Sequence, residues 1–148
     1  MTEYDDIDIL LVEDDPIDAE MTIQALRRAN LANRLYWVRD GVEATDFIFC
    51  RGPFADRDPL HAIKVVLLDL KMPRVGGLEV LRELKTHVET QKIPIVVMTS
   101  SNHDKDIAES YRLGANGYVS KPVNFDAFSA AIQNIGTYWL VLNEAPTL

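Results

Sequence analysis

The stretch Val65-Val66-Leu67-Leu68-Asp69 places a carboxylate directly after a run of branched apolar residues. Such a run cannot alternate between a buried and a solvated face, so it predicts a strand buried on both sides, as in a parallel sheet. Further segments end in polar residues in the same way: Ile9–Val12 before Glu13-Asp14-Asp15, residues 95–98 before Thr99, and residues 117–119 before Ser120-Lys121-Pro122.

The carboxyl ends of parallel strands meet at one edge of the sheet, so we expect these polar groups to lie together. They comprise several carboxylates, one hydroxyl and one ammonium. Crowded carboxylates repel one another unless a cation lies between them. This edge therefore predicts a metal site.

Strand-like runs alternate with segments of helical periodicity along the chain. Leu35–Val38 predicts one more strand, and the last helix is expected at about residues 125–143. Five strand–helix repeats predict an α/β fold, a doubly wound, five-stranded parallel sheet. We take its strands in the order 2-1-3-4-5, which is one of the common orders of such sheets. Ligands of such sheets bind where the strand order reverses, here between the strands that end at Glu13-Asp14 and Asp69.

Composition narrows the class of protein. A chain of 148 residues with 47% apolar residues suits one compact domain over residues 1–148. No apolar stretch approaches the roughly 20 residues of a membrane span, and the acidic N-terminus is unlike a signal peptide. A lone cysteine, Cys50, excludes an internal disulfide, and a net charge of −8 argues against binding nucleic acid or anionic membranes. We expect a cytoplasmic protein.

Several motifs together resemble the receiver domain of two-component response regulators, over about residues 6–143. They are Glu13-Asp14, Asp69 with Met72-Pro73, Thr99, and Tyr118-Val119-Ser120-Lys121-Pro122. The separation of 22 residues between Thr99 and Lys121 is typical of that family. The resemblance implies the flavodoxin-like receiver fold and a signalling protein that turns over no external substrate. Its partner would be a sensor histidine kinase or a phosphotransfer protein.

The resemblance also implies a role for each acidic residue. Asp69 would be the phosphoacceptor. Mg²⁺, replaceable by Mn²⁺, would be bound by Asp14, Asp69 and the backbone carbonyl of Lys71, and by Glu13 through a water molecule. A shift of the motif by one residue would pair Asp14 with Asp15 instead. Asp15 precedes a proline at a predicted helix start, which favours a helix cap for it.

The remaining motif residues would respond to the phosphoryl group. Lys121 and Thr99 would each bind one of its oxygens. Displacement of Thr99 would let Tyr118 turn inward and change the face formed by the fourth helix, fifth strand and fifth helix. The family resemblance further implies a cis peptide bond between Lys121 and Pro122.

The last predicted helix carries more apolar residues than one face needs. Phe125, Phe128, Ile132, Ile135, Trp139 and Leu142 share one face, and Tyr138, Leu140 and Val141 lie on others. A large apolar surface on a projecting helix marks a partner interface, although a longer helix could simply cover more core. We predict a homodimer through the faces of the fourth and fifth helices, with Phe128, Tyr138, Trp139 and Leu142 at the interface.

Only 26 residues follow Pro122, and the last helix uses most of them, so we expect no output domain. The protein would act by docking on an effector or as a phosphorelay intermediate. Residues 51–61 and Tyr138-Trp139-Leu140 resemble the stand-alone regulators paired with bacterial phytochrome kinases.

Other classes of protein fit the motifs less well. A phosphatase of the haloacid dehalogenase type would have a second acid where this chain has Lys71. A flavodoxin-like electron carrier would need a phosphate loop where this chain has Glu13-Asp14-Asp15. A scaffolding pseudo-receiver would normally lack part of this motif set.

Overall fold

The computed structural model describes residues 4, 6–59, 61, 63–72, 74–100, 103–121, 124–144 and 146 of the chain. The predicted cis peptide bond before Pro122 and the motif residue Pro73 lie outside these residues. None of the helices in the described part of the chain has the length and apolarity that a bilayer crossing needs.

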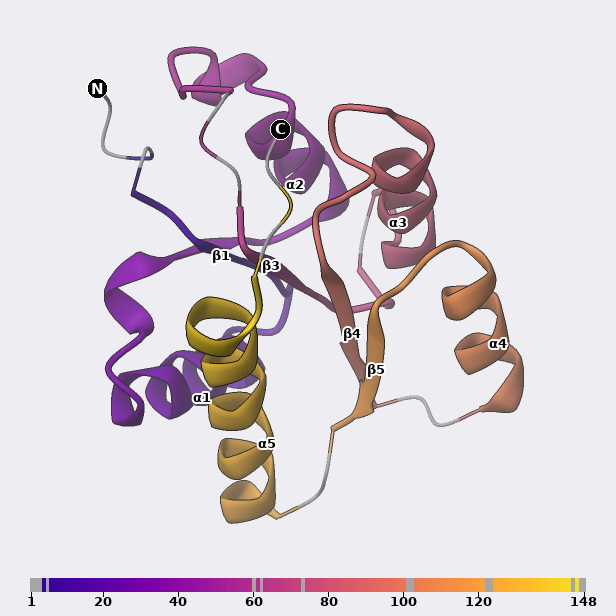
Figure 1. The fold of residues 1–148 in the computed structure, drawn as a ribbon. Coiled ribbons are helices and arrows are strands. Elements are labelled where there is room, and N and C mark those ends of the chain that lie inside the picture. The colour runs from indigo at the N-terminus through magenta and orange to yellow at the C-terminus, as the bar shows by residue number, and fades with distance from the viewer. Residues whose placement is uncertain are drawn as a thin grey trace.

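The five strands form a single parallel sheet in the predicted order β2-β1-β3-β4-β5 (Figure 1). Their bounds are β1 Ile9–Val12, β2 Leu35–Val38, β3 Val65–Leu68, β4 Ile95–Thr99 and β5 Gly117–Ser120. The central strands β1, β3 and β4 are buried along their whole length, whereas β2 and β5 lie at the edges and are partly exposed. Val12 is paired with Leu68, so the residues that follow these two strands are neighbours at the carboxyl edge.

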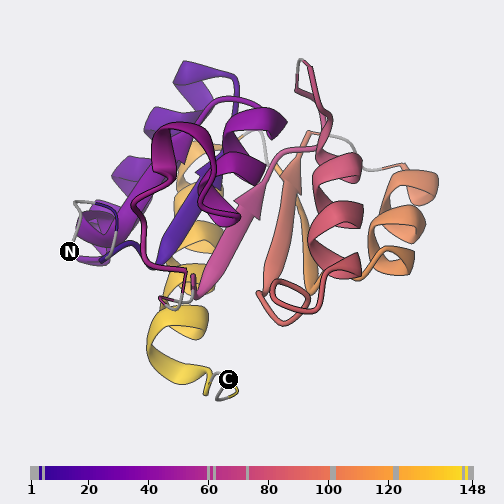
Figure 2. The same ribbon diagram turned by 90° about the horizontal axis from the view of Figure 1, so that it is seen from above.

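Helices cover both faces of the sheet (Figures 1 and 2). The helices α1 Pro16–Arg28 and α5 Phe125–Thr137 lie on one face, and α2 Gly41–Ile48, α3 Gly77–Thr86 and α4 Asp104–Arg112 lie on the other. Successive strand residues alternate between the two cores, as a period of two requires. In β1, for example, Ile9 and Leu11 pack under α1 and α5, and Leu10 and Val12 pack toward α2 and α3.

The first helix begins where the sequence predicts. Asp15 is its N-cap, and its Oδ1 accepts a hydrogen bond of 2.8 Å from the backbone N–H of Ile17. Pro16 follows at the first helical position, where its missing N–H costs nothing. The cap role of Asp15 is thus confirmed, which leaves Glu13 and Asp14 as the acidic pair.

The loop after α2 is not a simple solvated connection. It contains the short helix η2 Gly52–Phe54, and both Phe54 and Arg57 are buried. The Arg57 guanidinium donates to the carbonyl oxygens of Phe47 at 2.9 Å and Ile48 at 3.2 Å. A cation at these last carbonyls of α2 is favoured by the helix dipole. The loop therefore folds back and caps α2.

The last helix continues beyond α5 as π-helical turns over Tyr138–Leu142, and its end extends past the sheet in Figure 2. Tyr138 and Leu142 are 48% and 66% exposed, and Trp139 is half-buried. Phe128 is only 2% exposed, because it packs with residues of α1 and the sheet. The prediction that Phe128 forms part of an interface is therefore wrong, since this chain already covers its side chain.

Candidate functional site

Three carboxylates converge at the carboxyl edge of β1 and β3. Glu13, Asp14 and Asp69 each offer an oxygen atom, and these atoms lie within 4.8 Å of one another. The strand ladder fixes two of the backbones, because Glu13 N–H donates to the Val38 carbonyl at 3.1 Å and Asp69 N–H donates to the Val12 carbonyl at 3.0 Å. Glu13 and Asp69 are buried, and Asp14 is exposed. The structure thus brings together the three acids that the sequence places at adjacent strand ends.

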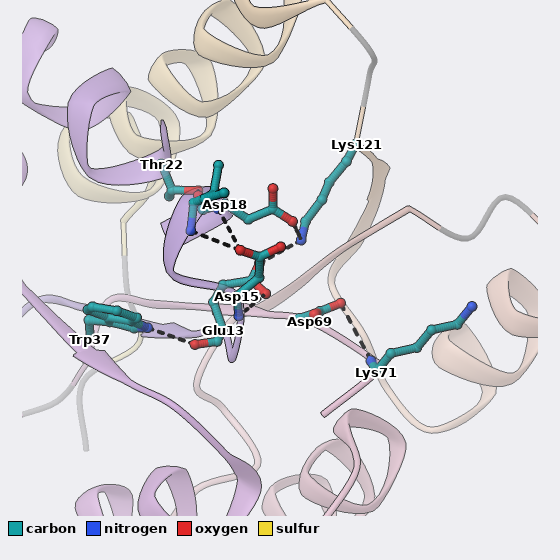
Figure 3. A network of polar contacts seen from close by, with 9 residues as sticks. Glu13, Asp15, Asp18, Thr22, Trp37, Asp69, Lys71 and Lys121 are labelled. Carbon is teal, nitrogen blue, oxygen red and sulfur yellow. Dashed lines mark hydrogen bonds and ion pairs between the residues drawn. The ribbon is translucent and has the colours of Figure 1, made fainter. Parts of the chain in front are cut away.

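The ammonium of Lys121 enters the same cluster from the end of β5. Its Nζ donates to Glu13 Oε1 at 2.5 Å and to Asp18 Oδ2 at 2.9 Å (Figure 3). The backbone N–H of Lys121 donates to the Thr99 carbonyl at 2.7 Å, which ties the end of β5 to the end of β4. The Lys121 side chain is 12% exposed, so its charge is largely removed from water.

The charges in this cluster alter the ionisation of both partners. Burial, with the nearby Asp69 carboxylate, raises the pKa of Glu13 to about 8, although the Lys121 ammonium opposes the rise. Burial also acts to lower the pKa of Lys121, but its hydrogen bonds to Glu13 and Asp18 raise that pKa above the usual value. Glu13 thus holds its proton chiefly because it is buried, and Lys121 holds its proton because acidic groups surround it. The cluster also contains an excess of acidic groups over the single ammonium. A divalent cation would offset this excess, and carboxylate oxygens are the ligands that Mg²⁺ prefers.

Lys71 lies beside the cluster through its backbone. Its N–H approaches Asp69 Oδ1 at 3.5 Å, and its side chain is exposed. Figure 3 shows the ammonium of Lys71 pointing away from the carboxylates. This arrangement agrees with a backbone role for Lys71, and the ligand role of its carbonyl stays a prediction.

The two predicted switch residues lie on β4 and β5. Thr99 is fully buried as the last residue of β4. Tyr118 is half-buried in β5 and packs against the core cluster under α2 and α3. In the sheet, Thr99 is paired with Ser120, which precedes Lys121, and Tyr118 is paired with Val97. The switch roles of both residues stay predictions.

Three residues of the site were not predicted from the sequence. Asp18 looks like an ordinary acid in the first turn of a helix, and nothing local indicates that Lys121 lies above it. Trp37 looks like an edge-strand aromatic, yet its indole N–H donates to the Glu13 carbonyl at 2.7 Å. Gly77 begins α3, and a Cβ there would overlap the carbonyl oxygen of Asp69 and lie 2.6 Å from the Cα of Leu70.

Comparison with known families decides what kind of domain carries this site. The model of the response regulator receiver domain matches residues 9–133. The chain belongs to this family. Receiver domains are signalling proteins of two-component systems, with a histidine kinase or phosphotransfer partner, and they turn over no external substrate. The predicted family, fold and class of protein are thereby confirmed.

Two curated relatives of this receiver domain match over most of their length. The probable methanogenesis regulatory protein FilR2 of Methanothrix harundinacea is 36% identical over 138 residues, which cover 93% of this chain and 86% of that protein. The response regulator Rcp1 of Synechocystis is 33% identical over 132 residues, 89% of this chain and 88% of Rcp1.

Solved structures extend the likeness. The phosphorylated cyanobacterial phytochrome response regulator RcpA superposes with a TM-score of 0.86 at 32% identity, over 94% of this chain and 97% of RcpA. A Mn²⁺-bound form of Rcp1 gives a TM-score of 0.85 at 32% identity, over 94% of this chain and 98% of Rcp1. The bacteriophytochrome response regulator RtBRR is 48% identical with a TM-score of 0.75, over 93% of this chain and 82% of RtBRR.

Proposed function

We propose that this receiver domain accepts a phosphoryl group onto Asp69 from a phosphohistidine of its kinase or phosphotransfer partner. An Asp69 carboxylate oxygen attacks phosphorus, the phosphorus–nitrogen bond breaks, and the imidazole leaves. The observation that carries this proposal is the grouping of the buried Asp69 with Glu13 and Asp14 within 4.8 Å. A carboxylate attacks an anionic phosphoryl group only where the combined negative charge is offset, and the Lys121 ammonium at this cluster contributes to that offset.

Asp14 and Asp69 would hold a Mg²⁺ ion, together with the backbone carbonyl of Lys71 and Glu13 through water. The cluster fits such an ion because its donors are hard oxygen atoms and its charge is predominantly negative. When bound, Mg²⁺ supplies neutralisation of the charge that develops between carboxylate and phosphoryl oxygens. Mn²⁺ would substitute for it, and the Mn²⁺-bound structure of the similar Rcp1 supports that choice.

Lys121 and Thr99 would bind the phosphoryl oxygens after transfer. Both belong to strand ends that are joined by the Lys121 N–H to Thr99 carbonyl hydrogen bond. Movement of Thr99 toward the phosphoryl group would open space for Tyr118, which is half-buried on the neighbouring strand, where it is paired with Val97. The signal would then reach the face of α4, β5 and α5.

We further propose a bacterial phytochrome as the kinase that this chain serves in the cytoplasm. The 48% identity to RtBRR and to AtBRR, both named as bacteriophytochrome response regulators, supports this pairing. The likeness to RcpA, a phytochrome response regulator, agrees with it.

Self-association through the last helix forms the final part of the proposal. Tyr138, Val141 and Leu142 are 48%, 65% and 66% exposed, and they lie together on the π-helical end. Apolar side chains gathered in this way favour a contact with a second copy of the chain. Phe128 has no part in that contact, because it is buried in the core.

Intact mass after incubation with acetyl phosphate and Mg²⁺ tests the phosphoacceptor. The wild type should gain the mass of one phosphoryl group, and Asp69→Asn should gain none. Asp126→Asn, which removes an exposed acid from the first turn of α5, should behave as the wild type. An adduct that persists in Asp69→Asn would place the acceptor elsewhere, and the absence of any adduct on the wild type would contradict the proposal.

A further inference from the structure

Two of the three N–H donors of the Lys121 ammonium are used within the cluster. Glu13 Oε1 accepts at 2.5 Å and Asp18 Oδ2 accepts at 2.9 Å. Among the residues that the structure describes, the ion pairs of Lys121 are with these two acids and not with Asp69. Figure 3 shows the ammonium between Glu13 and Asp18, on the side of the cluster that faces α1. Lys121 is therefore drawn toward α1 when Asp69 carries no phosphoryl group.

We propose that Asp18 is a positioning residue that competes with the phosphoryl group for Lys121. It holds the ammonium on the α1 side while Asp69 is unmodified, and it releases the ammonium when Asp69 carries a phosphoryl group. The inference rests on the proposed phosphorylation of Asp69 and adds to it a partner that the family motif does not contain.

The exposure of the two acids decides which contact is exchanged. The Glu13 side chain is 4% exposed, so losing Lys121 would leave a buried carboxyl oxygen without its hydrogen-bond donor, which is costly. The Asp18 side chain is 33% exposed, so water can solvate it once Lys121 leaves. A phosphoryl group brings up to about two negative charges, which outweigh the single charge of a part-exposed carboxylate. The Asp18 contact is thus the one that yields.

Asp18 also has an ordinary structural role, and the two roles predict different results. It lies in the first turn of α1, where a negative charge is favoured by the helix dipole. Loss of that role alone would lower stability and leave the affinity of the site for a phosphoryl group unchanged. Asp126 occupies the first turn of α5 and is exposed, so Asp126→Asn is the matched control for a dipole effect.

Affinity for beryllofluoride, a phosphoryl analogue, measures the competition directly in the presence of saturating Mg²⁺. Asp18→Asn should bind the analogue about two- to fivefold more tightly than the wild type, because a part-exposed ion pair no longer opposes the transfer of Lys121. Asp18→Glu, which keeps the charge, should restore most of the wild-type affinity. Asp126→Asn should equal the wild type.

The ¹⁵Nζ resonance of Lys121 supplies a readout that helix stability does not affect. In the wild type it should shift when beryllofluoride binds, and in Asp18→Asn without the analogue it should already differ from the wild-type position. Unchanged or weakened affinity in Asp18→Asn, or a Lys121 resonance that does not respond to the substitution, would overturn the inference. If the wild type itself fails to bind beryllofluoride through Asp69, the proposed function fails instead, and Asp69→Asn distinguishes the two outcomes.

Discussion

The indole N–H of Trp37 donates a hydrogen bond of 2.7 Å to the backbone carbonyl of Glu13. This contact joins the edge strand β2 to the residue that carries one of the three clustered carboxylates. The Arg39 guanidinium lies over the Trp37 ring, 4.4 Å from its centroid. The environment of the Trp37 indole therefore depends on the position of Glu13 and on the nearby charge of Arg39.

Mg²⁺ binding should change the fluorescence of Trp37. The chain has two tryptophans, so Trp139→Phe leaves Trp37 as the sole reporter. We expect a saturable change in emission as Mg²⁺ is added to this variant, because the cation alters the charge around Glu13 and the carbonyl that accepts from the indole. The same titration with Asp14→Asn added should require at least about tenfold more Mg²⁺, since one carboxylate ligand is lost. Equal titrations in the two variants would contradict the metal assignment.

Gly77 should tolerate no side chain, although its neighbour Gly76 should. A Cβ at Gly77 would overlap the Asp69 carbonyl and lie 2.6 Å from the Cα of Leu70, and backbone atoms cannot rotate away. A Cβ at Gly76 would meet only the Leu70 carbonyl, at an ordinary 3.7 Å. Gly77→Ala should lower the free energy of unfolding by about 1–3 kcal/mol and slow phosphorylation by acetyl phosphate, since Asp69 must shift.

Gly76→Ala is the control for this effect. It should change the free energy of unfolding in urea by less than about 1 kcal/mol and leave the rate of phosphorylation near the wild-type value. Equal effects of the two substitutions would mean that the close approach of α3 to Asp69 is unimportant.

The pH dependence of stability should report the ion pair of Asp40 and Arg74. Arg74 Nη2 donates to Asp40 Oδ2 at 2.5 Å, and Asp40 also caps α2 by accepting from Glu43 N–H at 2.9 Å. Burial acts to raise the pKa of Asp40, but these hydrogen bonds lower it overall below the usual 3.8. Because the pKa is lower in the folded state, the ionised form stabilises the protein above the unfolded-state pKa. That stabilisation is lost as the pH falls through the folded-state pKa.

Asp40→Asn keeps a cap acceptor and removes the charge. At pH 7 it should lower the free energy of unfolding by about 0.5–1 kcal/mol, and the difference from the wild type should shrink as the pH falls from about 5 to about 2. Urea denaturation at several pH values measures this. A difference that stays constant with pH would show that the cap, and not the ion pair, is responsible.

Charge at the exposed end of the last helix should prevent self-association. Leu142 is 66% exposed, so Leu142→Glu should shift sedimentation toward the monomer without lowering the free energy of unfolding. Trp139 is a poorer choice, because it is half-buried against the core. Val88→Glu is the control, because Val88 is also apolar and 77% exposed but lies just after α3 and not on the last helix. It should leave the sedimentation of the protein unchanged, and the same mass for Leu142→Glu and the wild type would contradict the dimer.

Local patterns in the sequence were enough to predict the sheet and the acids at its edge. The runs Ile9–Val12 and Val65–Leu68 predict doubly buried strands, and the residue that follows a strand must lie at its carboxyl end. The strand order then brings Glu13, Asp14 and Asp69 together without any knowledge of side-chain packing. The cap at Asp15 was predictable for the same reason, because it depends on only three successive residues.

Contacts between side chains that are distant in the sequence were decided only by the tertiary structure. Lys121 and Asp18 are paired because β5 ends above the first turn of α1, and no local pattern encodes that crossing. Phe128 was assigned to an interface because periodicity shows that one face of a helix is apolar, but it does not show what covers that face. In the structure, residues of α1 and the sheet cover Phe128. The sequence by itself therefore determined which groups reach the carboxyl edge, since strand ends are local. The structure decided which of those groups pair there, since pairing depends on how helices from distant parts of the chain pack against the sheet.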